Sequence, residues 1–438
     1  MFDYTSPMAR ASGASVPGFD YVRSKRGIHE YRLRSNGLRC LIYPRSDVPV
    51  VAVMVTYHIG SRHEKPGTTG STHILEHMMF KGSKHFDQKK GRGFGAVIET
   101  TGAQANATTW LDRTNYYEIL PVENLKDALR IEADRMKNLL LREADLASEM
   151  IVVRNEYERG RNDPHRILSS KLWETAFTLH PYHYDTIGLK DDIESVTVQK
   201  LRTFYESHYW PNNATISIIG DISVPSALRE ILAVFGNIRA GMEPASRITP
   251  EPPQNKERVV SLVRQGAVRA VGIGYKTPDA RHGDTAALGI LATLLADGKS
   301  SLLQRALVDS ALSTSVSVFP SRFLDPGLLE FTISLSGKTS HKRALGVFNR
   351  VVSNVTTGRI ERPDIIRAKA YAVARILGYS TSISGFMQIL NESIASGDWA
   401  TSRTFAAELD AVSMSDVVRV AQMYLVQEGR TVVDLKTV

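Results

Sequence analysis

The stretch THILEHMMFKG, residues 72–82, places two histidines and one glutamate in an otherwise apolar segment. Each residue of an α-helix adds about 100° of rotation, so His73, Glu76 and His77 share one face while isoleucine, leucine and methionine cover much of the rest. A helix that is apolar around most of its circumference is normally buried, and buried ionisable groups are costly without partners. The stretch therefore predicts a buried helix whose polar face binds something, and a metal ion is the first candidate.

A second copy of this pattern occurs in the other half of the chain. VAVMVTYHIG…ILEHMMFKG, within residues 51–82, matches RAVGIGYKT…ILATLLADG, within residues 269–298. In both copies an apolar, strand-like run leads through a polar loop to an Ile-Leu-led helix and a closing glycine. When Ile74 is set on Ile290, the residues opposite His73, Glu76 and His77 are Gly289, Ala292 and Thr293. The second copy keeps the apolar pattern without any of these polar groups, so the fold does not require them.

The internal repeat and a proline-rich segment predict the domain organisation. Residues 239–257, RAGMEPASRITPEPPQNKE, contain four prolines and no apolar periodicity, which is typical of a linker. The segment separates a first lobe, residues 28–238, from a homologous second lobe, residues 258–438, and residues 1–27 are expected to form a poorly ordered tail. Strands and helices do not alternate strictly in the first half. We therefore expect an α+β fold of two homologous lobes, each a mixed or antiparallel sheet with helices packed on it, which together form half of a clamshell.

Local patterns in the first lobe predict its main elements. Residues 49–58 and 213–221 are expected to form strands, and residues 106–120 a pair of strands bent around LDRTN. Residues 71–80 are expected to form the helix that carries the polar face. Long helical patterns cover residues 122–141 and residues 145–161.

Composition narrows the class of protein. The chain is 42% hydrophobic and 23% charged, as in an ordinary globular protein, and its net charge of +8 comes from interspersed residues. The densest basic cluster, Lys89, Lys90 and Arg92, is better explained by a solvated surface than by a nucleic-acid partner. Cys40 is the only cysteine, which excludes an intrachain disulfide and a zinc site built from cysteines.

The distribution of apolar residues along the chain helps to predict where in the cell the protein is located. No apolar run reaches about 18 residues, so no membrane span is expected. The first 27 residues lack the apolar core of a secretory signal. The sequence as it stands predicts a soluble, cytoplasmic protein, whereas a targeting segment removed during maturation would instead be consistent with the periplasm or the mitochondrial matrix.

The polar helix face offers only part of a metal site. Two histidines at positions i and i+4 can reach one ion, and a catalytic Zn²⁺ takes three protein ligands and keeps one position open. The pattern from Asp145 onward places Glu149 and Glu156 about 20° apart beside a buried stripe. Spacing does not choose between these two glutamates, and on pattern alone both fit a solvated flank. The proline and tyrosine content of HPYHYD, residues 180–185, favours a packed loop over a second metal site.

The segment around the two histidines is similar to a known motif. GSRHEKPGTTGSTHILEHMMFKGS, residues 60–83, resembles the inverted zinc-binding motif, HxxEH, of the pitrilysin-like metallopeptidases, or inverzincins. The similarity extends through GAQANATTWLDRTNYY, VVRNEYERGRNDP, HPYHYDTIG and YWPNNATISIIGD, and more weakly through the second half. The branch that matches best consists of short, two-domain subunits and includes mitochondrial processing peptidase.

This resemblance implies a function and a role for each matching residue. The chain would be a zinc-dependent endopeptidase subunit that hydrolyses peptides or unfolded polypeptide segments. The matching positions are His73, His77 and Glu156 as zinc ligands, Glu76 as general base on a zinc-bound water, Glu149 as a supporting carboxylate, and Asn106 and Ala107 on a substrate-binding edge strand. The alternative is a non-catalytic structural or assembly subunit of the same family. The intact HxxEH set favours the enzyme.

The second half departs from the family pattern. Active members usually carry an arginine and, seven residues later, a tyrosine that contact the substrate. The matching positions are Leu307 and Thr314, and the nearest cation, Arg305, is two residues out of register. Either substrate contacts are weaker here, or another chain supplies the pair, and we favour the second interpretation. We therefore expect a heterodimer with a homologous subunit that carries the arginine and tyrosine and lacks HxxEH, with self-association when the chain is alone.

Overall fold

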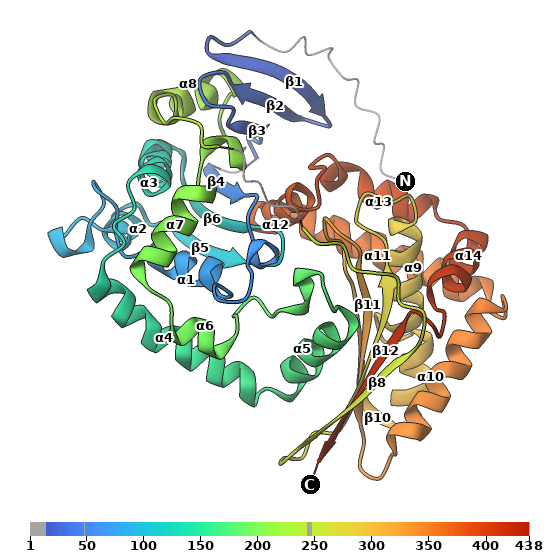
Figure 1. Ribbon diagram of the computed structural model, residues 1–438. Helices are drawn as coiled ribbons and strands as arrows, with labels where there is room; N and C mark the ends of the chain where they lie inside the picture. Colours follow the sequence, from blue (N-terminus) through green and yellow to red (C-terminus); the bar gives the residue numbers. More distant parts are fainter. Residues whose placement is uncertain (1–14, 48, 243–247, 438) are drawn as a thin grey trace.

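The computed structural model describes residues 15–47, 49–242 and 248–437, which form two lobes, each built on one mixed β-sheet (Figure 1). The first sheet has seven strands in the order β1-β2-β3-β7-β4-β6-β5. Their bounds are β1 Phe19–Lys25, β2 Ile28–Leu33, β3 Arg39–Pro44, β4 Val50–Tyr57, β5 Gln104–Thr109, β6 Thr114–Pro121 and β7 Ala214–Gly220. The second sheet has five strands, β8 Arg258–Arg264, β9 Ala270–Thr277, β10 Ser313–Pro320, β11 Gly327–Leu335 and β12 Arg430–Thr437.

The two sheets share one topology. The five-strand order β3-β7-β4-β6-β5 corresponds to β8-β12-β9-β11-β10. In each set the first pair is parallel, β3 with β7 and β8 with β12, and the remaining pairs are antiparallel. The prediction of an α+β fold with two similar lobes is confirmed, and the hairpin β1–β2 is an addition to the first lobe.

Helices cover the sheets of both lobes. The helices of the first half are α1 Ser71–Met78, α2 Phe94–Thr101, α3 Leu125–Lys137, α4 Glu143–Asn162, α5 Pro164–Ala176, α6 Lys190–Glu194, α7 Val198–His208 and α8 Val224–Phe235. Those of the second half are α9 Thr285–Ala296, α10 His341–Thr356, α11 Arg362–Thr381, α12 Ile383–Ala395, α13 Thr401–Ala411 and α14 Met414–Tyr424. None of the described helices combines the length and apolar character that a membrane crossing requires.

The two halves exchange one helix each. α5 belongs to the first half but packs on the second sheet, where Leu168 and Leu172 join a core with Val433 and Leu435 of β12. Conversely, α12 belongs to the second half and packs on β4 and β7 of the first sheet. Both helices lie between the two sheets in Figure 1. Each lobe therefore completes its core with a helix from the other half of the chain.

The expectation that residues 1–27 form a poorly ordered tail is wrong for residues 19–25. Residues 19–25 form β1 at the edge of the first sheet, while residues 1–14 lie outside the described part of the chain. β1 buries only Phe19, and the other large side chains of the strand, Tyr21 and Val22, are exposed. The loop between β1 and β2 has Arg26 and Gly27 at φ 45° and 89°, as a two-residue hairpin turn requires.

Candidate metal centre

The helix α1 is held at its N-terminus by a buried carboxylate. Glu64 is 4% exposed, and its two oxygens accept hydrogen bonds from the amides of Gly70 at 2.7 Å and Thr72 at 2.6 Å. Burial raises the pKa of Glu64 to about 7, although these hydrogen bonds oppose the shift. Gly70 has φ 82°, and a Cβ there would lie 2.6 Å from the carbonyl oxygen of Ile187. These contacts set the start of α1 and hence the direction of its polar face.

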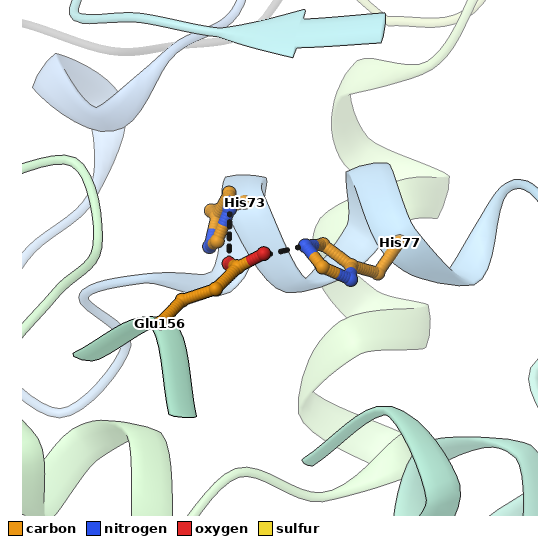
Figure 2. A group of neighbouring side chains, drawn as sticks. All are labelled: His73, His77 and Glu156. Carbon is orange, nitrogen blue, oxygen red and sulfur yellow. Dashed lines mark ion pairs between the residues drawn. The ribbon is translucent and has the colours of Figure 1, made fainter. Parts of the chain in front are cut away.

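Three of the predicted residues converge on one point (Figure 2). His73 and His77 point from α1 toward Glu156 of α4, and one ligand atom from each of the three lies within 4.8 Å of the others. The Oε2 atom of Glu156 is 3.4 Å from Nε2 of His73 and 3.5 Å from Nε2 of His77. Two imidazoles and one carboxylate form a donor set that suits Zn²⁺. Burial and the neighbouring His77 lower the pKa of His73 to about 4, so its imidazole is neutral at pH 7, as a metal ligand must be.

The two candidate glutamates of α4 take different positions. Glu149 does not reach His73; its Oε2 lies 2.9 Å from Nδ1 of His77, on the side of the ring opposite the nitrogen that faces Glu156. Its other oxygen pairs with Lys81. Burial alone would raise the pKa of Glu149, but the hydrogen bonds from Lys81 and His77 hold it below its usual value. Geometry thus separates two residues that helical spacing left equivalent.

Glu76 lies on the same face of α1 but outside the three-residue group. Its Oε2 accepts a hydrogen bond from the hydroxyl of Thr109 on β5. Burial raises the pKa of Glu76, which brings it toward the range suited to proton transfer near neutral pH. The carboxylate borders a cavity of about 720 Å³ that is also lined by His77, Glu149, Glu156 and Asn106.

The strand β5 forms the outer edge of the first sheet next to this cavity. It pairs with β6 on one side, and it is the last strand in the sheet order. Asn106 is exposed, and its Oδ1 accepts a hydrogen bond of 2.8 Å from the amide of Ala107. The Ala107 amide therefore points to the free edge of the sheet, while the Ala107 side chain is buried.

The histidines of HPYHYD serve in a packed loop. Nε2 of His180 lies 3.0 Å from Asp325, and Nδ1 of His183 lies 2.7 Å from the carbonyl oxygen of Phe177. Tyr182 between them is 1% exposed.

The two second-half positions that correspond to the family's arginine and tyrosine lie in different settings. Leu307 is fully buried in the core of the second lobe, whereas Thr314 is exposed on β10. The guanidinium of Arg305 donates to Asp364 on α11 at 2.9 Å. The nearest cation is therefore engaged within its own lobe.

Three residues that hold the site together escaped the sequence analysis. Glu64 holds the start of α1, Thr109 orients Glu76, and Lys81 pairs with Glu149. Thr109 follows the predicted edge-strand positions, which is the one local signal for it. Glu64 lies in the loop before α1, and Lys81 lies in the turn after α1 and reaches Glu149 on α4, so periodicity does not reveal these contacts.

Comparison with known protein families supports the motif assignment. Residues 41–189 match the model described as insulinase, peptidase family M16, and residues 195–371 match the model described as the peptidase M16 inactive domain. The chain belongs to peptidase family M16. In this M16 chain the polar group on α1 lies in the segment matched by the first model, and the apolar α9 lies in the segment matched by the second.

Individual relatives agree with this family. The zinc protease PqqE of Helicobacter pylori is 29% identical over 434 residues, which cover 97% of this chain and 95% of that protein. A probable mitochondrial-processing peptidase subunit beta of Arabidopsis thaliana is 24% identical, over 89% of this M16 chain and 75% of the relative. The crystal structure of a protease from Helicobacter pylori superposes with a TM-score of 0.87 at 27% identity, covering 96% of this chain and all of the other.

Proposed function

We propose that this protein is a zinc-dependent endopeptidase subunit, in which His73, His77 and Glu156 hold the metal. The observation that carries the proposal is the convergence of these three side chains beside the carboxylate of Glu76 and an open sheet edge. Relatives named zinc proteases support the same activity.

The residues around the metal have separate tasks in the proposed reaction. Zn²⁺, when bound, would activate water and polarise the scissile carbonyl. Glu76 takes the proton from the attacking water and passes it to the leaving amine. The hydroxyl of Thr109 holds Glu76 in place, and Glu149 fixes the ring of His77 through Nδ1.

The edge strand β5 is proposed to bind the substrate. A peptide can add to a free sheet edge through main-chain hydrogen bonds, and the amide of Ala107 faces that edge. The side-chain oxygen of Asn106 occupies this amide now and would have to yield it to a substrate carbonyl. Main-chain pairing needs an extended chain, so peptides and unfolded segments are the proposed substrates.

We further propose that the two lobes have different roles in the reaction. Residues 28–238 supply the zinc chemistry, residues 239–257 connect the lobes, and residues 258–438 form the opposite wall of the substrate chamber. Leu307 is buried and Thr314 is short, so neither replaces a substrate-binding arginine and tyrosine. A homologous partner subunit that lacks HxxEH is proposed to supply that pair, and the similarity to a mitochondrial-processing peptidase subunit supports this pairing.

Metal analysis combined with a peptidase assay tests the zinc function. The purified chain should contain one zinc per chain and cleave an unfolded peptide in the presence of the partner subunit. Activity should disappear with a chelator and return with zinc. Stoichiometric zinc without hydrolysis of any peptide, with or without a partner, would favour a structural subunit instead.

The partner requirement has its own test. The chain is assayed on the same peptide alone and with a homologous subunit that carries the arginine and tyrosine. We expect weak cleavage by the isolated chain and a large increase with the partner. Full activity alone, unchanged by the partner, would show that the pair is dispensable.

A further inference from the structure

A second cavity lies in the second half of the chain, at the start of α9. It has a volume of about 700 Å³, and its wall is formed by the loop before α9, the first turn of α9, and residues of α13 and α14. Both of these helices pack against α9. None of the residues that line the cavity belongs to the candidate metal centre, so the two sites are separate.

One residue of the wall, Arg322, is a cation without an acidic partner in contact. Its Nε is shielded from solvent and has no hydrogen-bond partner among the described residues. Its Cζ lies 3.7 Å from the ring centroid of Phe405, so this ring covers one face of the guanidinium. Burial lowers the pKa of Arg322 to about 10, with Glu408 and Glu392 opposing the shift, and the side chain is therefore charged at pH 7.

The acidic residues of the wall do not neutralise this guanidinium by contact. Asp398 pairs with Arg23 of β1 at 2.8 Å, and Asp416 accepts a hydrogen bond of 3.0 Å from the amide of Ser413. Glu408 on α13 is exposed and influences Arg322 only through space. The cavity thus contains a buried positive charge whose hydrogen-bonding groups are free for a ligand.

The start of α9 adds further donors to the same wall. Asp284, which precedes the helix, does not cap it; its carboxylate accepts hydrogen bonds from Arg419 at 2.6 Å and from Tyr424 at 2.8 Å. The amides of Ala286 and Ala287 have no hydrogen-bond partner within the described part of the chain, and both residues line the cavity. Unpaired amides at the start of a helix favour an anion.

The first lobe fills the equivalent position with a side chain of its own. Glu64 accepts hydrogen bonds from the amides of Gly70 and Thr72 at the start of α1. It lies in a loop, residues 58–70, that is longer than the corresponding loop before α9, residues 278–284. The shorter loop brings no carboxylate to the amides of α9. A carboxylate supplied by a ligand would restore the interaction that α1 has.

We propose that this cavity binds a ligand through a carboxylate group, which the guanidinium of Arg322 and the amides of Ala286 and Ala287 hold. Stacking on Phe405 uses the face of the guanidinium and leaves its N–H groups free, and their planar arrangement matches the two oxygens of a carboxylate. A single negative charge also suits a wall that includes Glu408 better than a phosphate dianion does. The site does not depend on the proposed peptidase function.

Nuclear magnetic resonance of the full-length chain, labelled with ¹⁵N, tests the site directly. The chain is titrated with acetate at constant ionic strength, and the signals of Arg322 Nε and of the amides of Ala286 and Ala287 are followed. We expect these signals to shift together and to saturate, whereas chloride should leave them unchanged. An acetylated trialanine peptide, with a free or an amidated C-terminus, identifies the source of the carboxylate. Tighter binding of the free form than of acetate would indicate a peptide C-terminus, and weaker binding a small organic acid.

Two variants should change the affinity for acetate in opposite directions. Arg322→Gln should weaken binding about 10-fold to 100-fold, as expected for the loss of a hydrogen bond to a charged group. Glu408→Gln should tighten binding about 2-fold to 5-fold, because it removes an exposed negative charge that acts on Arg322. Arg350→Gln is the matched control, since it removes an exposed arginine of α10 outside the cavity and should leave the affinity unchanged.

Several results would overturn the proposal. These are an equal response to chloride, an affinity for acetate that survives Arg322→Gln, and weaker binding in Glu408→Gln. Tighter binding of inorganic phosphate than of acetate would overturn the assignment to a carboxylate. If Arg322→Gln folds poorly, the shifts in the unmodified chain and the affinity of the surface variant Glu408→Gln still decide the outcome.

Discussion

α1 in the first lobe and α9 in the second occupy equivalent places, since they follow β4 and β9, the middle strands of the five-strand order that the two sheets share. Nine of the twelve residues of α9 are buried, all of them apolar or threonine. In α1 the apolar residues are equally buried, but His73, Glu76 and His77 form a half-buried polar face. The difference shows that the polar face is an addition to a packing scheme that is complete without it.

The neighbouring helices repeat the contrast. α4 and α11 both have 20 residues, and each precedes the helix that crosses to the other sheet. The seventh and fourteenth residues are Glu149 and Glu156 in α4, but Ala368 and Arg375 in α11. Arg375 pairs with Asp297 just beyond α9, which is an ion pair with no role at a metal. Five positions, three on α1 and two on α4, thus distinguish the two otherwise similar lobes.

The largest effect is expected at Glu76. Glu76→Gln should keep zinc bound and reduce peptide hydrolysis by about 10²–10⁴-fold or more, because the proton acceptor is lost. Zinc content and kcat/KM are measured together. Glu99→Gln is the matched control, since it removes an exposed carboxylate from the same cavity and should retain activity. Near wild-type hydrolysis by Glu76→Gln would place the base elsewhere.

A charge placed on α9 tests whether the second lobe can tolerate the polar group that α1 carries. Ala292→Glu should lower the free energy of unfolding by about 3–5 kcal/mol, because Ala292 is 1% exposed and the new carboxylate would have no partner. The reverse change, Glu76→Ala, should leave the stability of the metal-free chain nearly unchanged. Chemical denaturation of both variants measures these effects. Similar losses in both would mean that the fold depends on Glu76.

Removal of a proposed ligand should empty the site. His77→Ala should remove most of the zinc, with a larger loss of affinity than the roughly 10–100-fold typical of an outer partner. His183→Ala removes a histidine that serves a packed loop and should leave the zinc content unchanged. Metal analysis after dialysis compares the two. Stoichiometric zinc in His77→Ala would refute the ligand assignment.

The smallest change is expected at Glu149. Glu149→Gln should retain zinc and lower activity by about 10-fold, because the amide can still accept from Nδ1 of His77 but carries no charge. Glu143→Gln, at the exposed start of the same helix, is the control. A complete loss of zinc in Glu149→Gln would indicate that Glu149 is itself a ligand. It would contradict the assignment of Glu156 as the carboxylate ligand and Glu149 as the partner of His77.

The sequence by itself determined the elements with strong local patterns. The buried helix over residues 71–80, the strands near residues 49–58 and 213–221, and the strand pair at 106–120 follow from periodicity, and the structure has them as α1, β4, β7 and β5–β6. The internal repeat determined that the lobes are alike. Hydrophobic periodicity and repetition are local properties of a chain, so they can be read before it folds.

Only the tertiary structure decided which distant residues meet. It separated Glu149 from Glu156 by the nitrogen of His77 that each one faces. It also paired β1 with β2 despite a single buried side chain in β1, and placed α5 and α12 on the opposite sheets. It also enclosed Glu330 of the second half with Trp173 of the first. Such contacts depend on how separate elements pack, and side chains at the same helical angle can face different neighbours, so no local pattern encodes them.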